Sequence, residues 1–450
     1  MEKPTLAAES NETLARVLHL IFTGEARTRP ELMAKSGLGR TLVAQRVEQG
    51  TSLGLLSAGG LAASTGGRAA RELRFREEAA RVLVSVFGAS GVALGITDLR
   101  GNVLISHYEP WDITAGPEAS MEFSAQRFDA MLAELGRETP VWGAAVGLPG
   151  PVEFETGKPV APPIMPGWDG YDIRGWIHDR YDIPVWVDND ANLMALGEFV
   201  HGEFSAPNLL FVKIGTGIGA GIITRGEVQR GANGAAGDIG HIAISEGSLT
   251  CRCGQIGCLE TVAGGWALAK EATTRIEQGE QSWLAGRLSE SGSLVAEDIA
   301  AGVAHGDPLA LQLVSHSARA LGESLASVIN VLNPSVVAVG GSVARTGDHF
   351  LAAVREIIYK RSLPLATRSL SVVPATLGRE QGIIGGASLV TNSLLRLESL
   401  ERWASAGSPL LLDRGLLYEL SDHYATLRPA DRGSRNDRPR IMAKATAATA

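Results

Sequence analysis

All three cysteines of this 450-residue chain lie in one short stretch. Cys251, Cys253 and Cys258 fall within eight residues, and His241 precedes the first of them by ten positions. Three thiolates and one imidazole complete a tetrahedral ligand set for Zn²⁺, and a filled set leaves no position for a catalytic water. The spacing therefore predicts a structural zinc ion bound by these four residues. The alternative is three reduced thiols in a glycine-rich loop, because an odd number of cysteines cannot all pair into disulfides.

A second group of polar residues follows an apolar strand. The string Val187-Asp188-Asn189-Asp190-Ala191-Asn192 comes after Val185-Trp186 and precedes a helical pattern. Polar side chains at the carboxyl end of a strand are where α/β proteins bind ligands. An Asn/Asp pair in front of a helix also serves as an N-cap, so both interpretations stay open at this point.

The first 80 residues have the pattern of a DNA-binding domain. Apolar residues at helical spacing predict a helix over 11–23, a second helix starts at Pro30, and a glycine-bearing turn precedes a third helix over 40–49. This is the spacing of a helix-turn-helix, with the third helix as the reader of the major groove. On that helix Arg40, Thr41 and Gln45 lie on the open side and are predicted to face bases.

A basic segment supports this interpretation. Residues 27–76 carry a net charge of +6, although the whole chain carries −8. The glycine-rich stretch after the third helix predicts a β-wing, on which Arg68 would contact phosphate or the minor groove. The alternative is a helix-turn-helix that never meets DNA and a basic loop that is merely solvated. Charge, turn and wing together favour binding of double-stranded DNA.

The middle of the chain contains a strand unit twice. Three strands separated by short turns occur from Arg81 to His107 and again from Leu209 to Arg230, and helical patterns follow each unit. This duplication predicts two related α/β lobes with a cleft between them.

Several motifs resemble those of the ROK family of sugar kinases and sugar-responsive repressors. The strings Cys251-Arg252-Cys253-Gly254 to Glu260 and Asn189-Asp190-Ala191-Asn192 match the family's cysteine and N-D-A-N motifs. In the G-E-x-G-H motif Asp238 replaces the family's glutamate. The resemblance implies an actin-like, two-lobed sugar-kinase fold behind an N-terminal winged helix-turn-helix. It covers roughly residues 11–390.

The resemblance also assigns roles to individual residues. It implies that a sugar is bound by Asn189, Asp190, Asp238, His241 and Glu260, and that Asp190 is the position of the kinases' catalytic base. It implies a phosphate loop formed by Gly215, Thr216, Gly217 and Gly219, although the same glycines serve a tight strand turn. The other phosphate loop of the kinases reads D-x-G-G-T, which here is Val86-Phe87-Gly88-Ala89-Ser90. Losing that aspartate argues against phosphoryl transfer.

Length and composition indicate the domain organisation and the compartment of the protein. We expect a winged helix-turn-helix over 1–80, lobes over 81–200 and 201–392, and a partly disordered extension over 393–450, in which residues 428–450 lack periodicity. No apolar run reaches the roughly 18 residues of a membrane span, and the first residues lack the order of a secretory signal. Reduced, metal-binding thiols indicate the cytoplasm.

Three functions are compatible with these features. The first is a homodimeric or larger repressor of carbohydrate genes that binds a DNA operator and responds to a small sugar or sugar phosphate. The second is an ATP-dependent sugar kinase that carries a DNA-binding domain, for which Asp190 is the supporting residue. The third is a sugar-binding assembly protein, against which the basic segment argues.

Overall fold

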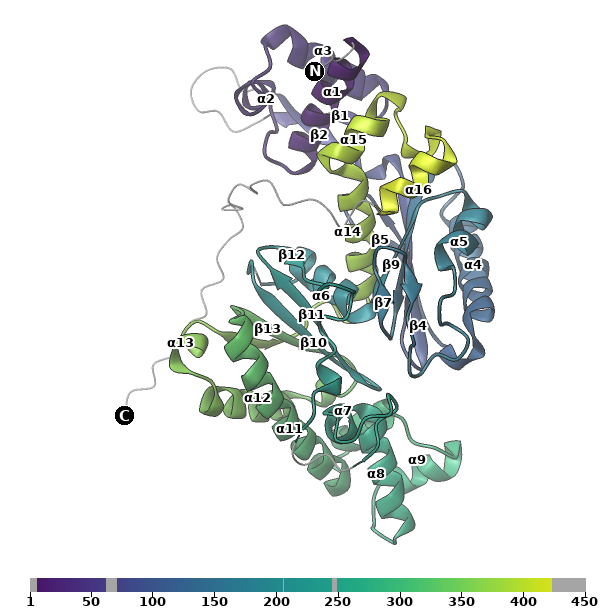
Figure 1. Cartoon of the computed structure of the whole chain (residues 1–450), viewed down its shortest axis with the longest axis vertical. Coiled ribbons are helices and arrows are strands. Elements are labelled where there is room, and N and C mark those ends of the chain that lie inside the picture. The colour runs from purple at the N-terminus through teal and green to yellow at the C-terminus, as the bar shows by residue number, and fades with distance from the viewer. Residues whose placement is uncertain (1–5, 62–70, 205, 245–248, 423–450) are drawn as a thin grey trace.

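The computed structural model of the chain describes residues 6–61, 71–204, 206–244 and 249–422. It is an α/β protein in which a small helical domain sits at one end of two lobes, each built on a β-sheet (Figure 1). Within the described ranges, no helix is both long and apolar enough to cross a membrane.

The N-terminal domain consists of three helices and a hairpin. These are α1 (Leu6–Phe22), α2 (Arg29–Ser36), α3 (Arg40–Ser52), β1 (Leu56–Leu61) and β2 (Arg71–Phe75). Thr28 and Glu31 start α2 with a reciprocal capping box, and Gly37 ends it in a left-handed conformation. The strands pair antiparallel, as the β-wing of a winged helix-turn-helix requires. The predicted wing tip around Arg68 lies outside the described residues.

The first lobe has a five-stranded sheet in the order β5-β4-β3-β6-β9. Its elements are β3 (Arg81–Phe87), β4 (Gly91–Asp98), β5 (Val103–Pro110), α4 (Pro117–Glu134), β6 (Val141–Leu148), β7 (Val152–Glu153), β8 (Lys158–Pro159), α5 (Ile173–Tyr181) and β9 (Val185–Asn189). Every residue of β3 and β4 is buried, because helices cover both faces of this sheet.

The second lobe repeats this topology, with the order β12-β11-β10-β13-β14. Its elements are β10 (Leu209–Ile214), β11 (Ile218–Thr224), β12 (Glu227–Val228), α7 (Glu260–Ala263), α8 (Gly265–Glu277), α9 (Leu284–Ser291), α10 (Ala296–Ala304), α11 (Pro308–Leu332), β13 (Val336–Gly340), α12 (Asp348–Arg361), α13 (Pro364–Thr367) and β14 (Ser371–Pro374). In each sheet an antiparallel hairpin is followed by parallel strands. The duplicated unit that the sequence predicts is therefore present.

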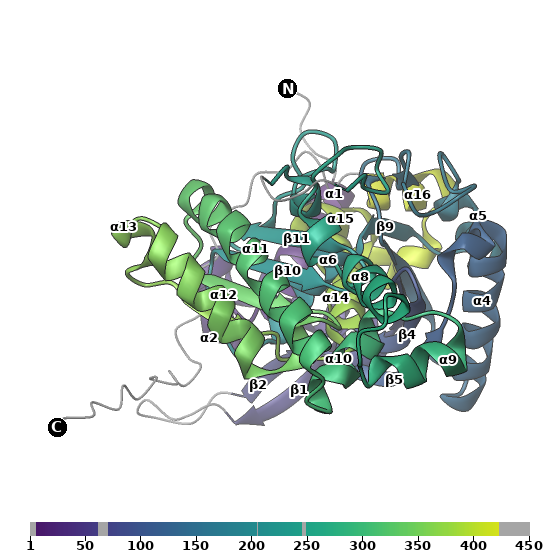
Figure 2. The ribbon, with the colours of Figure 1, turned by 90° about the horizontal axis from the view of Figure 1, so that it is seen from below.

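Helices cover the outer sides of both lobes. Seen from below, α11 and α12 lie over the second lobe, and α4 and α5 lie at the outer edge of the first (Figure 2). Between the two sheets lie α6 (Asp190–His201) and α14 (Gln381–Leu395), which pack directly on each other. A Cβ on Gly385 would collide with the Leu193 carbonyl oxygen, and one on Gly197 would collide with that of Gln381. Only glycine permits this close approach of two backbones.

The last helices join the N-terminal domain to the first lobe. They are α15 (Leu397–Trp403), which packs on α1, and α16 (Arg414–Asp422). Trp403 lies edge-on to Trp142 of the first lobe at 5.1 Å between ring centroids, and His19 of α1 hydrogen-bonds to the Leu395 carbonyl oxygen at 3.1 Å. The predicted boundary after residue 392 falls inside α14, and the predicted disordered stretch 428–450 lies outside the described residues.

We expect Gly385→Ala to lower the free energy of unfolding by about 1–3 kcal/mol, because the added methyl group overpacks the contact between α6 and α14. Chemical denaturation followed by circular dichroism measures this. The control is Gly286→Ala on α9, where an added Cβ meets nothing within 4 Å. It should be neutral or stabilise by up to about 1 kcal/mol. Equal stability of the two variants would contradict the close approach.

Candidate functional site

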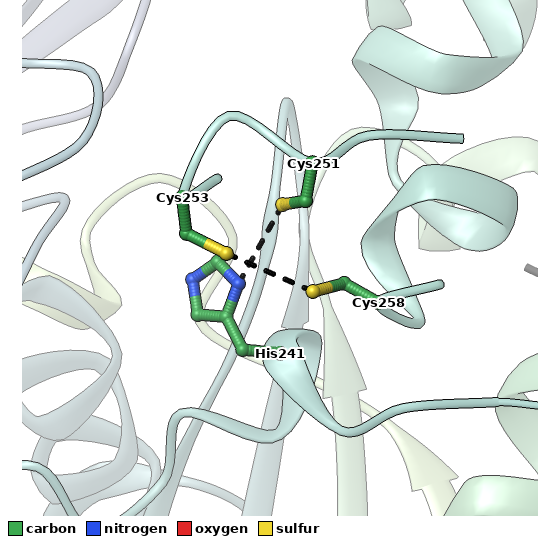
Figure 3. Close-up of side chains that lie close together, drawn as sticks. All are labelled: His241, Cys251, Cys253 and Cys258. Carbon is green, nitrogen blue, oxygen red and sulfur yellow. Dashed lines mark hydrogen bonds between the residues drawn. The ribbon is translucent and has the colours of Figure 1, made fainter. Parts of the chain in front are cut away.

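The four candidate metal ligands converge in the loop region before α7. The ligand atoms of His241, Cys251, Cys253 and Cys258 all lie within 4.8 Å of one another (Figure 3). His241 Nδ1 is 3.7 Å from Cys251 Sγ, and Cys253 Sγ is 3.7 Å from Cys258 Sγ. The cysteines come from a tight turn, and the histidine comes from the short helical turn that precedes it.

These separations fit a tetrahedral ion. With Zn–S bonds of about 2.3 Å and Zn–N bonds of about 2.1 Å, neighbouring ligand atoms lie about 3.6–3.8 Å apart. A sulfur–sulfur distance of 3.7 Å is far beyond the roughly 2.05 Å of a disulfide. Soft thiolates with one imidazole are also the donors that select zinc rather than magnesium or calcium. The cluster could therefore hold a metal ion.

A cavity of about 230 Å³ is lined by residues from both lobes. It brings together all the residues that the resemblance associates with sugar and phosphate, namely Asn189, Asp190, Asp238, His241, Glu260, Gly215, Thr216, Gly217 and Gly219. The positions come from β9, α6, α7, the turn between β10 and β11 with the start of β11, and the short helical turn Ile239–His241 with its N-cap Asp238. A ring of carboxylates, an amide and an imidazole offers both donors and acceptors, which suits a ligand with many hydroxyl groups.

Asn189 and Asp190 stand where β9 ends and α6 begins. The Asn189 side-chain oxygen accepts a hydrogen bond from the Ala191 amide at 2.9 Å, and its amide group donates to the Gly150 carbonyl oxygen at 3.1 Å. Asn189 is thus the N-cap of α6 while still lining the cavity. Asp190 is only 4% exposed, and burial raises the pKa of its carboxyl group above the ordinary value.

Lys213 was not among the predicted site residues. Its ammonium group forms an ion pair with the Asp190 carboxylate, which lowers the pKa of Asp190 and so opposes the effect of burial. Lys213 is the one charged residue in the apolar strand β10, two positions before Gly215. A charged side chain inside a buried strand requires a partner of opposite charge. The lysine in this apolar strand was therefore the feature of the sequence that could have identified it as a site residue.

Glu260 connects the cysteine cluster to the cavity. It is the first residue of α7 and is 7% exposed. Its Oε1 lies 3.2 Å from Cys251 Sγ, and Glu260 also lines the cavity, as does His241. Outer groups that contact metal ligands orient those ligands. A metal in the cluster would therefore fix two residues of the cavity wall.

A second ion pair crosses between the lobes. Arg230, from the segment after β12, donates to Asp188 Oδ2 of β9 through Nε at 2.9 Å and Nη2 at 2.6 Å. The Asp188 side chain also accepts from the Asn192 amide at 2.9 Å. Both charged side chains are buried, and the guanidinium lies over the Phe154 ring at 3.7 Å. Sequence reasoning missed Arg230, because nothing in its local pattern identifies the distant partner.

The loop that differs from the kinase pattern also lines the cavity. Val86 is the residue before the last of β3 and its side chain is buried, and Gly88, Ala89 and Ser90 form the turn that follows the strand. The Val86 side chain fills the space that a Cβ on Gly382 of α14 would need. An aliphatic group supplies neither charge nor a metal ligand to a phosphate.

The predicted base-reading residues lie on one face of α3. Arg40, Thr41 and Gln45 are exposed, whereas Val43 and Val47 of the same helix are buried. The helix therefore turns an apolar side to the domain and a polar side to the solvent, as an element that enters a DNA groove must. Arg68, the predicted wing residue, lies outside the described residues.

The chain was compared with protein families and known proteins. The ROK family matches residues 86–393. Among curated proteins, a xylose repressor from Caldicellulosiruptor bescii is 26% identical over 402 residues, covering 88% of this chain and 98% of its own length. A glucokinase from Halalkalibacterium halodurans is 38% identical over 250 residues, covering 55% of this chain and 76% of its own length.

Solved structures of ROK family proteins are also similar to this chain. A ROK family transcriptional regulator, described as a homolog of the E. coli MLC protein, has a TM-score of 0.70 at 27% identity and covers 92% of this chain and 99% of its own. A ROK family glucokinase from Streptomyces griseus, solved with glucose and AMPPNP, has a TM-score of 0.59 at 27% identity. It covers 69% of this chain and 98% of its own. These matches confirm the predicted fold class.

We expect purified protein to contain about one zinc ion per chain by elemental analysis, since four ligands at tetrahedral spacing complete a closed site. Cys253→Ser should lower the zinc content to less than about a tenth and also lower the melting temperature, because structural zinc contributes folding free energy. Gln255→Ala, an exposed neighbour in the same loop, is the control and should retain zinc. A folded wild type with less than about a tenth of an equivalent of zinc would end this prediction.

Proposed function

Because this chain belongs to the ROK family, we propose that it acts as a sugar-responsive DNA-binding transcriptional regulator, a repressor of carbohydrate metabolism genes. Relatives named as xylose repressors align over 84% and 88% of this chain. The glucokinase matches span a smaller share of it. This difference in coverage supports a family domain that is combined with a DNA-binding domain.

The observation that carries the proposal is the course of α14. At its start Gln381 and Gly382 line the cavity, and at its end the Leu395 carbonyl oxygen bonds to His19 of the DNA-binding domain. Fifteen helical residues span about 22 Å. A displacement at the cavity would therefore be transmitted along a rigid helix to α15 and α1. The sugar changes DNA affinity only if it binds the DNA-bound and released states unequally.

The DNA partner is inferred from α3. Its exposed face with Arg40, Thr41 and Gln45 enters the major groove. Recognition of a palindromic operator requires two copies of the domain, so we propose a homodimer. The cysteine cluster holds one structural Zn²⁺, which fixes His241 and Glu260 toward the sugar.

The alternative function is an ATP-dependent ROK sugar kinase that carries a DNA-binding domain. It is favoured by Asp190, which is buried and lines the cavity at the position of the kinases' base. Val86 is the contrary observation. Phosphoryl transfer depends on groups that neutralise the charge around the phosphate. Loss of one preorganised group of this kind lowers the rate by a factor of about 10²–10³.

The test of the regulator is binding to DNA from upstream of its own gene, measured by fluorescence anisotropy with and without sugars. We expect specific binding that changes with one sugar. Gln45→Ala should weaken the operator complex about tenfold or more and relax specificity at one base pair, because one base contact contributes about 1–3 kcal/mol. Lys360→Ala, exposed on α12 of the second lobe, is the control. Equal affinity of the Gln45 variant and wild type would refute the assignment of α3.

We expect wild-type turnover with the best-binding sugar, ATP and Mg²⁺ to stay well below the ordinary enzyme range of roughly 1–10³ s⁻¹ in a coupled assay. The triple variant Val86→Asp, Ala89→Gly and Ser90→Thr restores the kinase pattern of the loop and should raise turnover. Turnover of the wild type within the ordinary range would favour the kinase over the regulator.

A further inference from the structure

Lys213 and Asp190 approach the cavity from opposite lobes. Asp190 begins α6 directly after the first lobe's β9, and Lys213 lies on β10 of the second lobe. Their side chains are 5% and 21% exposed, and both line the cavity. The pair is therefore nearly withdrawn from bulk water, and its remaining exposed part faces the space where a ligand binds.

We propose that Lys213 is a specificity-determining residue, and that the Asp190–Lys213 pair binds one hydroxyl group of an uncharged sugar. This rests on the proposed sugar-responsive function. A carboxylate only accepts hydrogen bonds and an ammonium group only donates them. A hydroxyl group does both, so it donates to Asp190 and accepts from Lys213. A deoxy analogue, in which hydrogen replaces that hydroxyl group, forms neither of these two hydrogen bonds.

The charges around the cavity favour an uncharged ligand. Besides the pair, its lining contains three carboxylates and three guanidinium groups: Asp238, Glu260, Glu297, Arg252, Arg345 and Arg379. The formal charges of these side chains cancel. Lys213 is the cation nearest in sequence to the glycine loop, but Asp190 already compensates it. A sugar phosphate would bring about two additional negative charges into a site with no surplus of positive charge.

The first experiment uses wild-type protein and isothermal titration calorimetry. The probes are D-glucose, D-xylose, D-mannose and N-acetyl-D-glucosamine, the monodeoxy analogues of the best binder, and its phosphate ester. We expect one neutral sugar to bind, its phosphate ester to bind at least about tenfold more weakly, and one deoxy analogue to lose roughly 10- to 100-fold in affinity. Tighter binding of the phosphate ester would overturn the proposal.

The second experiment replaces the cation. Lys213→Met should weaken binding of the best sugar by roughly 10- to 100-fold and bring the sugar and its discriminated deoxy analogue to within about threefold of each other. Lys360→Met on α12 is the matched control and should leave both affinities unchanged. Retained affinity and retained discrimination in Lys213→Met would overturn the role of Lys213 while leaving the sugar-responsive function intact.

Removing one partner of a buried pair destabilises a protein, because it leaves an uncompensated charge. If Lys213→Met does not fold, the double variant Lys213→Met with Asp190→Leu removes both charges and leaves no hydrogen-bonding group at the pair, so it should likewise fail to discriminate the deoxy analogue. Discrimination retained by the double variant would overturn the proposal. If neither a neutral sugar nor a phosphate ester binds wild-type protein, the proposed function itself fails. The two failures are thereby distinguished.

Discussion

The contact between α6 and α14 is the constraint on which the arrangement of this protein depends. Gly197 and Gly385 let the two backbones touch, and the pair of helices fills the space between the two sheets. The starts of both helices, Asp190 and Gln381, reach the same cavity. A looser helix pair would separate the walls of the cavity and displace the far end of α14 from α1. One steric requirement thus sets both the ligand site and the attachment of the DNA-binding domain.

Local pattern was sufficient to predict much of this fold. Apolar runs and the turns between them identified β3, β4, β5 and β9 of the first sheet and β10, β11 and β12 of the second, whereas β6, β13 and β14 were not predicted as strands. The spacing of the three cysteines and His241 led to a cluster whose ligand atoms do lie together. The assignment of Asn189, Asp190 and Glu260 to a sugar came from family resemblance. Their residue types alone are compatible with an N-cap or an ordinary buried carboxylate. The cavity they share supports that assignment but does not test it.

Pairings between distant segments could not be predicted in this way. Lys213 meets Asp190, Arg230 meets Asp188 and α15 packs on α1 only because the chain folds back across the lobes. Each of these contacts depends on tertiary geometry, which local periodicity does not contain. Buried charge is the exception, because Lys213 in an apolar strand already implies a partner before the partner is known.

Val86 lies where the kinase pattern has an aspartate, and its side chain takes part in a packing contact. In the kinase pattern this position carries an aspartate that acts on phosphate. Here its side chain packs on Gly382, at the start of the helix that runs to the DNA-binding domain. A carboxylate at this buried place would need water, metal or a partner, whereas valine packs there without one. At the position that the resemblance assigns to the kinases' aspartate, Val86 thus packs α14 against the first lobe. Because α14 is followed by α15, which packs on α1, a ligand that shifted the Val86 loop relative to Gly382 would displace a helix connected to the N-terminal domain.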